Sequence, residues 1–338
     1  MERYMLDLIN GLDRSDQQLT YVTTKVDPEL VETLGITVHK VPNYLFRKAN
    51  DYSLFKTAHT IVENIENSCS IATSPMRNAD IAVCGGNHPG YLSVVRSKRP
   101  FTDKLQLHME KIFYAHAKHV VAHSERMRGE ILEYFDTSED SVTTIYPPTD
   151  TNRFRLIDDE QRLRNRKKLG FADDQVVFLF PSTGHTRKGL PLLAEVFSTL
   201  PANAILVVAG APINIPVPAN VRSLGYVSDM PTTYSAADFT TLASTYEPFG
   251  LVAPKSILCG TPVIFSDNIG SIEVIEDEAC RLFSRDCLDT AIATFQDAIE
   301  STRTSPLRVR EPLSALRYDP SPATHVKALL DIAKRLME

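Results

Sequence analysis

Short apolar runs alternate with helical patterns along most of this 338-residue chain, and this alternation limits the possible folds more than any other feature. In the second half, apolar runs cover residues 176–180, 204–210 and 239–242, and segments with helical spacing lie at 190–200 and 229–237. Strands that are separated by helices pair in parallel and are covered on both faces. We therefore predict an α/β fold built on parallel sheets.

The first half shows the same alternation but opens with a helix, where an alternating domain normally opens with a strand. Its predicted strands lie at 19–24, 36–41, 80–84, 118–122 and 142–146, and its predicted helices lie at 2–13, about 50–66 and from 124 onward. Paired prolines at 147 and 148 interrupt regular structure, and a chain of this length can form two domains of about 150 residues. We predict domains at 1–148 and 149–320, and a final helix within 321–338.

Composition and charge exclude several classes of protein. The net charge of −6 argues against a nucleic-acid-binding protein of the basic type. No run approaches the roughly 18 consecutive apolar residues of a membrane span, and acidic residues among the first apolar ones argue against a secretory signal. The five cysteines contain no Cys-x-x-Cys pair, which indicates reduced thiols in a cytosolic protein.

One segment departs from the acidic balance of the whole chain. Residues 96–128 contain eight basic and three acidic residues, an excess of five positive charges. Such a segment can dock on an anionic membrane or on an anionic acceptor. A solvated helix face gives the same pattern more often, so both interpretations stay open.

The stretch from Ser244 to Ile264 has the pattern of a ligand site after a parallel strand. It places Glu247 and a Pro-Phe249-Gly250 turn before an apolar helix. Glycine lets the backbone approach a ligand closely, and the N–H groups of Gly250, Leu251 and Val252 at the helix start can bind a phosphate. An ordinary loop-to-helix connection would use similar residues.

A second candidate loop follows the apolar run at 176–180. Its sequence carries Gly184, His185, Arg187 and Lys188 before the next helix, an arrangement that can hold a phosphate between N–H groups and fixed cations. It lacks the Gly-x-x-x-x-Gly-Lys-Ser/Thr pattern of a Walker loop. The chain also contains no Gly-x-Gly-x-x-Gly sequence that would support a nicotinamide-dependent enzyme.

Histidine occurs at two places that invite a functional interpretation. His88 lies in a glycine-rich turn after the predicted strand at 80–84, at the sheet edge where α/β proteins bind ligands; a histidine that serves a loop hydrogen bond is equally consistent with the pattern. His116, His119 and His123 run from a helix end through a strand and cannot share one helical face. We therefore expect no metal site there.

Several of these sequences, taken in order, resemble the group 1 (family 4) retaining glycosyltransferases of the GT-B fold, a family that includes bacterial lipopolysaccharide-core and other cell-surface polysaccharide hexosyltransferases. The resemblance is strong from about 140 to 280 and looser before that. It rests on Tyr-Pro-Pro-Thr-Asp-Thr-Asn-Arg-Phe at 146–154, Arg-Lys-Gly-Leu at 187–190, Val-Val-Ala-Gly at 207–210, Ala-Ala-Asp at 236–238, Glu-Pro-Phe-Gly-Leu-Val at 247–252 and Cys-Gly-Thr-Pro-Val-Ile at 259–264.

The resemblance implies two Rossmann-like domains that face a cleft, with the last helix packing back on the first domain. It implies a UDP- or GDP-linked sugar donor in the second domain, a glycan or glycolipid acceptor on the first, and no metal or other cofactor. Lys188 matches the family's diphosphate-binding lysine, with Arg187 beside it, and Glu247 matches the glutamate that holds sugar hydroxyls. His88 corresponds to a first-domain histidine near the donor sugar. A cytoplasmic enzyme at the inner face of the plasma membrane is the expected setting.

Three departures from the family pattern bear on activity. Lys255 stands where the family has a second glutamate that binds the ribose, and a lysine cannot accept hydrogen bonds. Thr183 stands where an arginine is usual. The family's first strand and Gly-Gly loop would precede Met1, so we expect about 15 residues of the natural product to be missing.

Two other functions stay open, and the departures motivate the first of them. The chain could be a degenerate relative that binds a nucleotide sugar or a partner without catalysing transfer. It could also be a nucleotide-sugar epimerase, which shares the two-domain architecture, although the acidic and histidine groups of that chemistry are not evident here.

Overall fold

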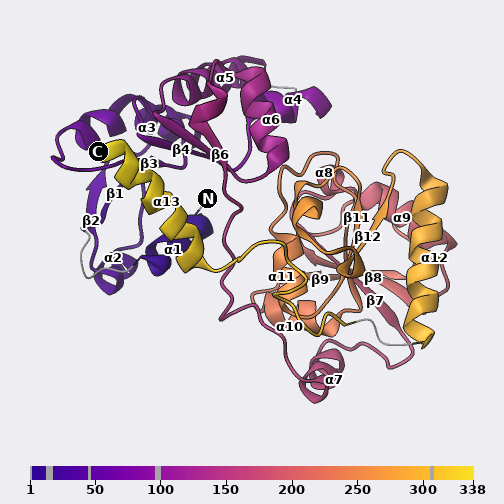
Figure 1. The fold of residues 1–338 in the computed structure, drawn as a ribbon. Coiled ribbons are helices and arrows are strands. Elements are labelled where there is room, and N and C mark those ends of the chain that lie inside the picture. The colour runs from indigo at the N-terminus through magenta and orange to yellow at the C-terminus, as the bar shows by residue number, and fades with distance from the viewer. Residues whose placement is uncertain (1, 13–17, 45–46, 96–99, 305–307) are drawn as a thin grey trace. The chain divides into compact units, whose positions relative to one another are not determined.

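In the computed structural model, residues 2–12, 18–44, 47–95, 100–304 and 308–338 are described (Figure 1). The chain divides into two compact units. Unit 1 comprises Met1–Pro148 and Ser321–Glu338, and unit 2 comprises Thr149–Pro320. The division between them falls directly after the paired prolines.

Unit 2 is built on a six-stranded parallel sheet with the order β12-β11-β10-β7-β8-β9. The strands are β7 (Val176–Ser182), β8 (Ala204–Gly210), β9 (Val221–Gly225), β10 (Phe239–Leu242), β11 (Val263–Ser266) and β12 (Cys280–Phe283). The helices are α7 (Asp159–Lys168), α8 (His185–Lys188), α9 (Leu190–Thr199), α10 (Met230–Ala236), α11 (Val252–Leu258) and α12 (Leu288–Thr304), with short 3-10 turns at Gly270–Val274 and Asp277–Ala279.

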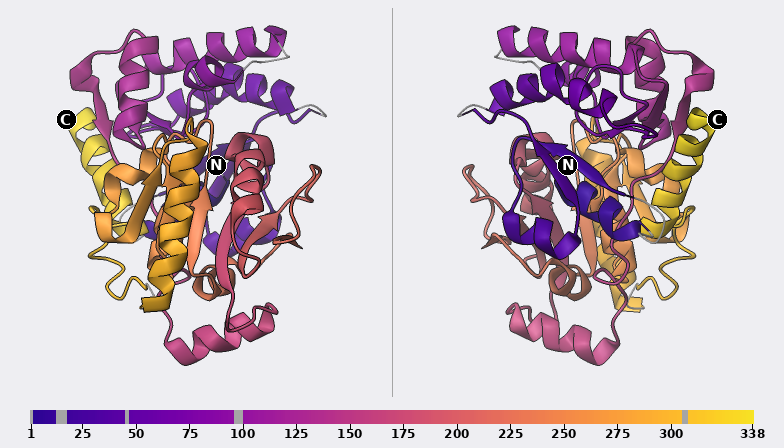
Figure 2. Two further views of the ribbon diagram at one scale, coloured as in Figure 1. Left: turned by 90° about the vertical axis from the view of Figure 1, so that its right-hand side faces the viewer. Right: turned by 90° about the vertical axis from the view of Figure 1, so that its left-hand side faces the viewer.

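Helices cover both faces of this sheet. Helices α9 and α12 lie side by side on one face, and α10 and α11 lie on the other, as Figure 1 and Figure 2 show. Every residue of β7 is buried, as expected for a central strand of a doubly covered sheet. Phe178 packs edge-on against Phe197 and stacks on Phe239, so aromatic rings from α9 and β10 fill the core beside β7.

Unit 1 contains two parallel sheets in its described part. One has the order β3-β4-β5-β6, and the other pairs β1 with β2. The strands are β1 (Thr20–Thr23), β2 (Thr37–Lys40), β3 (Ile71–Ala72), β4 (Ile81–Cys84), β5 (His119–Ala122) and β6 (Val142–Thr144). The helices are α1 (Glu2–Gly11), α2 (Pro28–Leu34), α3 (Arg47–Glu63), α4 (His88–Val94), α5 (Pro100–Ala115) and α6 (Glu125–Tyr134), with a 3-10 turn at Glu139–Ser141.

The last helix, α13 (Pro322–Met337), belongs to unit 1 and packs against α1 (Figure 1). Tyr4 and Leu8 of α1 share a core cluster with Val326 and Leu329 of α13 and with residues of β4 and β5. Gly11 allows this contact, because a Cβ at that position would lie 2.6 Å from the carbonyl oxygen of Pro322. The packing of the final helix on the first half of the chain confirms that part of the predicted fold.

The predicted glycine-rich turn after β4 is shorter than expected, because α4 begins inside it at His88. Asn87 caps this helix by accepting a hydrogen bond from the Gly90 N–H at 2.7 Å, and Pro89 lies in the first turn, where its missing N–H costs nothing. No helix in the described ranges combines the length and the apolar character needed to cross a bilayer. The parallel α/β architecture that we predicted is confirmed.

Candidate functional site

Two loops at the carboxyl edge of the unit 2 sheet are bonded directly to each other. The segment after β7, which includes the short helix α8, contains Arg187 and Lys188, and the loop after the neighbouring strand β10 contains Thr245. The Thr245 N–H donates to the Arg187 carbonyl at 2.7 Å, and the Ala243 N–H donates to the Lys188 carbonyl at 3.1 Å. The two candidate loops therefore form one rigid edge.

Glycine is required where these loops meet. Gly189 has a φ of +87°, and a Cβ there would lie 1.9 Å from the carbonyl oxygen of Ala243. Only glycine tolerates both the left-handed backbone and this approach. The glycine that the sequence places at the end of the Arg-Lys-Gly-Leu segment thus brings the basic loop against the end of β10.

A third loop, after β11, fixes the Glu247-Pro-Phe-Gly250 turn from the other side. The Gly270 N–H donates to the Glu247 carbonyl at 3.0 Å, and the Ser271 N–H donates to the Phe249 carbonyl at 2.7 Å. Gly250 itself has a φ of +97°, which favours glycine. The backbone that carries Glu247 is therefore anchored on both sides.

Arg187 and Glu247 form an ion pair. The Arg187 Nη1 donates to Glu247 Oε2 at 3.0 Å and to the Tyr246 carbonyl at 2.6 Å, and the Ser244 hydroxyl donates to the same Oε2 at 3.3 Å. The Glu247 side chain is only 15% exposed. Within the described residues Oε1 of Glu247 accepts no hydrogen bond, so half of a fixed carboxylate remains available to a ligand.

Lys188 lies beside this pair but does not join it. Its Nζ donates to the Pro181 carbonyl at 3.0 Å, and no carboxylate of the described chain lies within ion-pair distance of it. Burial lowers the pKa of Lys188, a shift that the Glu247 carboxylate opposes and Arg187 reinforces. An ammonium has three N–H donors, so this half-buried cation has donors to spare and lacks a close counter-charge.

Two predicted site residues use their side chains inside the protein. The ring of His185 is buried between the Ser182 hydroxyl, 2.9 Å from Nδ1, and the Ala211 and Pro212 carbonyls, 3.0 and 3.1 Å from Nε2. Phe249 is buried edge-on against Tyr318. Both side chains hold loops together, so a ligand could meet only the backbone of these residues.

The remaining predicted residues of the two loops lie nearer the surface. Thr183 is exposed, Gly184 is partly exposed at the start of α8, and Leu251 and Val252 are partly exposed at the start of α11. Helix α8 has four residues and α11 has seven, so their macrodipoles are small. At these helix starts the N–H groups therefore contribute more to anion binding than the macrodipoles do.

Lys255, at the second-glutamate position of the family pattern, points toward the segment 149–154. Its Nζ lies 5.4 Å from the centroid of the Phe154 ring, and the Arg153 guanidinium lies 5.3 Å from the same centroid. Phe154 in turn packs edge-on against Tyr234 of α10. A cation, supported by a buried aromatic ring, thus occupies this part of α11.

His88, the predicted site residue of unit 1, is held by two carboxylates of α5. The His88 N–H donates to Glu110 Oε2 at 2.8 Å, and the ring Nε2 lies 2.9 Å from Asp103 Oδ1. The spacing of Asp103, Gln106 and Glu110 at i, i+3 and i+7 places all three on one face of α5. Sequence reasoning missed both acids, and this helical spacing was the signal that could have found them.

The three histidines considered as a possible metal cluster, at 116, 119 and 123, lie in different surroundings. His116 is exposed after α5, and Nε2 of His119 lies 2.9 Å from the Thr143 hydroxyl on β6. His123 is buried against Tyr4 and His325. Their rings share no common focus.

Acids from outside the segment 96–128 pair with several of its cations. Lys118 pairs with Asp80 at 2.7 Å, Arg128 pairs with Glu139 at 2.9 Å, and Arg126 pairs with Glu130. Arg96, Lys98 and Arg99 lie outside the described residues. The positive excess of the segment is therefore smaller in space than along the sequence, and its exposed part includes Lys104 and Lys111 of α5.

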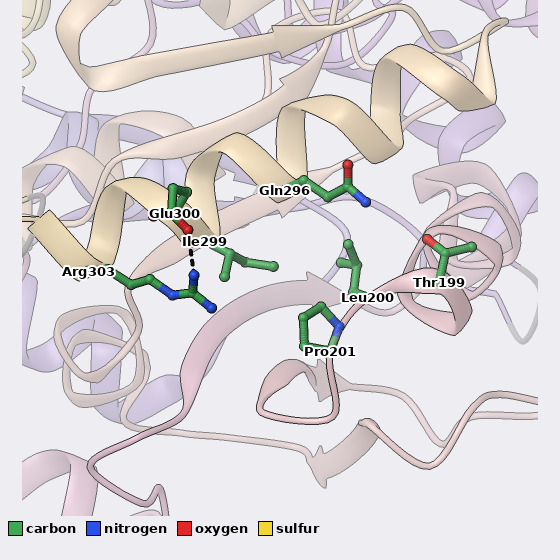
Figure 3. Close-up of a pocket in the computed structure, with 7 residues that line it drawn as sticks. All are labelled: Thr199, Leu200, Pro201, Gln296, Ile299, Glu300 and Arg303. Atoms are coloured by element: carbon green, nitrogen blue, oxygen red, sulfur yellow. Dashed lines mark hydrogen bonds and ion pairs between the residues drawn. The ribbon is translucent and has the colours of Figure 1, made fainter.

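A shallow hollow of about 470 Å³ in unit 2 lies away from these loops (Figure 3). It is lined by the end of α9 and the last turns of α12: Thr199, Leu200, Pro201, Gln296, Ile299, Glu300 and Arg303. Helix α9 runs from the carboxyl edge of the sheet back to the amino edge, where β8 begins, so the hollow lies at the opposite edge from the candidate site. Ligands of open α/β sheets bind at the carboxyl edge.

Two α/β units joined at paired prolines, with the last helix returning to the first unit, define a protein of the GT-B class. Solved structures agree: the chain is similar to WaaG, a glycosyltransferase involved in lipopolysaccharide biosynthesis, with a TM-score of 0.76 and 14% identity over 99% of this chain and 94% of that one. It is also similar to Anabaena HepE, solved in complex with UDP and glucose, with a TM-score of 0.68 and 16% identity over 97% and 95% of the two chains.

Sequence comparison identifies the family. The chain is 36% identical over 341 residues to a probable transglycosylase of Burkholderia thailandensis, covering 98% of this chain and 93% of that one. Residues 161–310 match the model of glycosyl transferases group 1, and residues 1–153 match that of glycosyltransferase family 4. The protein belongs to the group 1 (family 4) glycosyltransferases.

Proposed function

We propose that this glycosyltransferase moves a hexose from a nucleotide-sugar donor to a glycan or glycolipid acceptor, with retention of anomeric configuration and without a metal ion. The observation that carries the proposal is the half-buried Lys188 ammonium beside the Arg187–Glu247 pair, at the carboxyl edge of the unit 2 sheet.

The diphosphate of the donor would supply the counter-charge that Lys188 lacks. Transfer of the sugar leaves negative charge on the departing phosphate, and a fixed cation in a partly desolvated site stabilises that charge. The spare N–H donors of Lys188 and the N–H groups at the starts of α8 and α11 are suited to this task. With these donors in place, the transfer needs no metal ion.

Gly184 fits the same role. Its φ of −132° is open to any residue, and a Cβ there would meet no atom of the described chain within 4 Å. Packing within the chain therefore gives no reason for glycine at this position. Close approach of a phosphate to the backbone gives one.

Glu247 would hold the sugar. Arg187 and Ser244 fix one carboxylate oxygen, and the other is open to accept hydrogen bonds from two vicinal hydroxyl groups. His88, at the carboxyl edge of β4, would bind a sugar hydroxyl group through its ring.

UDP-linked sugars are the first donors to test, because HepE was solved in complex with UDP-glucose and has the same fold. Lys255 affects this choice. Where a carboxylate would accept from the ribose hydroxyls, an ammonium can only donate. The donor site would therefore depend on the ribose hydroxyls less than a site with glutamate at this position.

The test is a transfer assay with UDP- and GDP-linked hexoses and a lipid-linked or oligosaccharide acceptor, with the anomeric configuration of the product read by NMR. We expect transfer with one donor class and a product of unchanged configuration. Replacing Lys188 with methionine should lower kcat/KM by about 10² to 10³, the range for removing one charge-stabilising donor. Lys167→Met, which removes an exposed lysine of α7, is the matched control.

Two results of this assay would reject the proposal. Donor binding without transfer to any acceptor would favour a degenerate, non-catalytic relative, the alternative that Lys255 and Thr183 suggest. An isomerised nucleotide sugar in the absence of acceptor would favour an epimerase. A product of inverted configuration would still demonstrate sugar transfer, but it would refute retention.

We propose further that the enzyme acts at the cytoplasmic face of an anionic membrane, through α5. Phe101, Lys104, His108 and Lys111 are all exposed and lie on one face of that helix, and Phe101 is 81% exposed. An apolar side chain beside cations suits the interface of an anionic bilayer.

Sedimentation with vesicles containing phosphatidylglycerol tests this docking. Binding should fall between low and high salt, because exposed charges are screened, and Phe101→Ser with Lys104→Glu should abolish it. Lys167→Met in unit 2 is again the control. Binding that is equal at both salt concentrations, or unchanged in the double variant, would refute an electrostatic docking face on α5.

A further inference from the structure

His88 is fixed on several sides by unit 1. Glu110 accepts from its backbone N–H at 2.8 Å, Asp103 lies 2.9 Å from its Nε2, and its ring stacks on Tyr91 with 5.9 Å between centroids. The side chains of His88 and Asp103 keep 19% and 15% exposure. The ring is therefore held in place while one edge stays accessible.

The Asp103 contact decides which ring nitrogen carries the proton. An ionised carboxylate only accepts hydrogen bonds, so Nε2 of His88 must donate to it. The neutral ring then has its lone pair on Nδ1. In the described part of the chain Nδ1 has no hydrogen-bond partner, so an accessible acceptor is left over from an otherwise satisfied side chain.

The backbone around the ring is equally constrained. Asn87, which caps α4, donates from Nδ2 to Glu130 Oε2 on α6 at 2.6 Å, and Glu110 receives a second bond from Gln106 at 2.7 Å. Asn87 and Glu110 are buried. Two acids from two helices thus hold the start of α4, which carries His88, and the Asp103 carboxylate contacts the ring.

We propose that Asp103 is a positioning residue for the transfer reaction: it holds His88 in the tautomer whose Nδ1 accepts a hydrogen bond from one hydroxyl group of the sugar. This inference rests on the proposed function, because it assigns the ligand of His88 to a sugar. The charged groups around the ring are Asp103 and Glu110 of α5, with Glu130 of α6 reached through Asn87.

The first test reads the tautomer and needs no activity. Two-bond proton–nitrogen NMR spectra of the full chain with ¹⁵N-labelled histidine, recorded at pH 9 and assigned with His88→Gln, should show protonated Nε2 and unprotonated Nδ1. In Asp103→Ala the two tautomers should mix. A wild-type ring protonated on Nδ1, or a tautomer unchanged in Asp103→Ala, would overturn the proposal.

The second test uses donor analogues that each lack one sugar hydroxyl. In the wild type, one analogue should lose about tenfold in kcat/KM, the equivalent of one hydrogen bond. In Asp103→Ala, kcat/KM for the natural donor should fall by about the same factor. The analogue that lacks the contacted hydroxyl should then react no more slowly than the natural donor. Asp103→Asn, whose amide oxygen can still accept from Nε2, should restore part of the rate.

A purely structural role for Asp103 gives a different result. In that case Asp103→Ala would lower kcat/KM for every donor by the same factor. The ratio between natural and deoxy donors would stay at its wild-type value, which would refute the positioning role. Glu139→Ala, which removes the pair with Arg128 in the same unit, is the control for loss of an ion pair. If the chain transfers no sugar, the same comparison of donor affinities by calorimetry decides the point, while the tautomer result stands by itself.

Discussion

Acid should weaken unit 1 through a buried cluster that joins α13 to the rest of the unit. Tyr4 of α1 donates to Nε2 of His325 at 2.8 Å, and Nδ1 of His325 donates to the Tyr146 carbonyl at 2.8 Å. His123, directly after β5, packs against both rings, and its Nε2 is buried without a partner in the described chain. The side chains of Tyr4, His123 and His325 are all buried.

Burial keeps both histidines neutral. It lowers the pKa of His123 from 6.5 to about 3, with His325 adding to the shift, and it lowers the pKa of His325 to about 4 against the opposing Tyr146 bond. Below pH 6.5 the unfolded chain binds protons that the folded chain does not, so stability falls as the pH falls. Each pH unit costs about 1.4 kcal/mol per histidine, or about 4 kcal/mol for the pair at pH 5.

Hydrogen exchange of α1 and α13 amides measures this effect, since the chain has no tryptophan to report unfolding by fluorescence. We expect the opening free energy to fall by about 4 kcal/mol from pH 7 to pH 5, after correction for intrinsic exchange, and the loss to halve in His325→Gln. His116→Gln, at an exposed position, should leave it unchanged. A flat profile in the wild type, or an undiminished loss in His325→Gln, would refute the reasoning.

Two further predictions concern unit 2. Lys255→Glu supplies an acceptor for the ribose hydroxyls. Calorimetry should therefore show that the preference for UDP over deoxyuridine diphosphate is about tenfold greater in the variant than in the wild type. An unchanged preference would exclude a ribose contact at this position. Gly189→Ala should lower the free energy of unfolding of unit 2 by more than 2 kcal/mol in urea denaturation, because its Cβ would lie 1.9 Å from the Ala243 carbonyl oxygen. Gly184→Ala, whose Cβ meets nothing, is the matched control and should change stability little.

The sequence predicted the central strands of unit 2 because local chemistry determines them. The apolar runs predicted at 176–180, 204–210 and 239–242 became the parallel strands β7, β8 and β10. The start of α4 was missed because the Asn87 cap and Pro89 outweighed the glycines around them. The roles predicted for the site residues remain predictions.

The pairings across the site could not be predicted, because they join residues far apart in the chain. Arg187 and Glu247 are 60 positions apart and meet only after β7 pairs with β10. The basic segment appeared uncompensated because its partners Asp80 and Glu139 lie outside it. Side-chain partners depend on tertiary packing, which periodicity along the sequence does not encode.

The most direct test of the donor site is calorimetric titration of the chain with UDP, GDP and their hexose conjugates, in parallel with Lys188→Met and the control Lys167→Met. If the carboxyl edge of unit 2 holds the diphosphate, one nucleotide class should bind, and its Kd should rise at least tenfold in Lys188→Met while the control stays at the wild-type value. Equal affinity of Lys188→Met and wild type for every nucleotide would contradict a diphosphate site at Lys188.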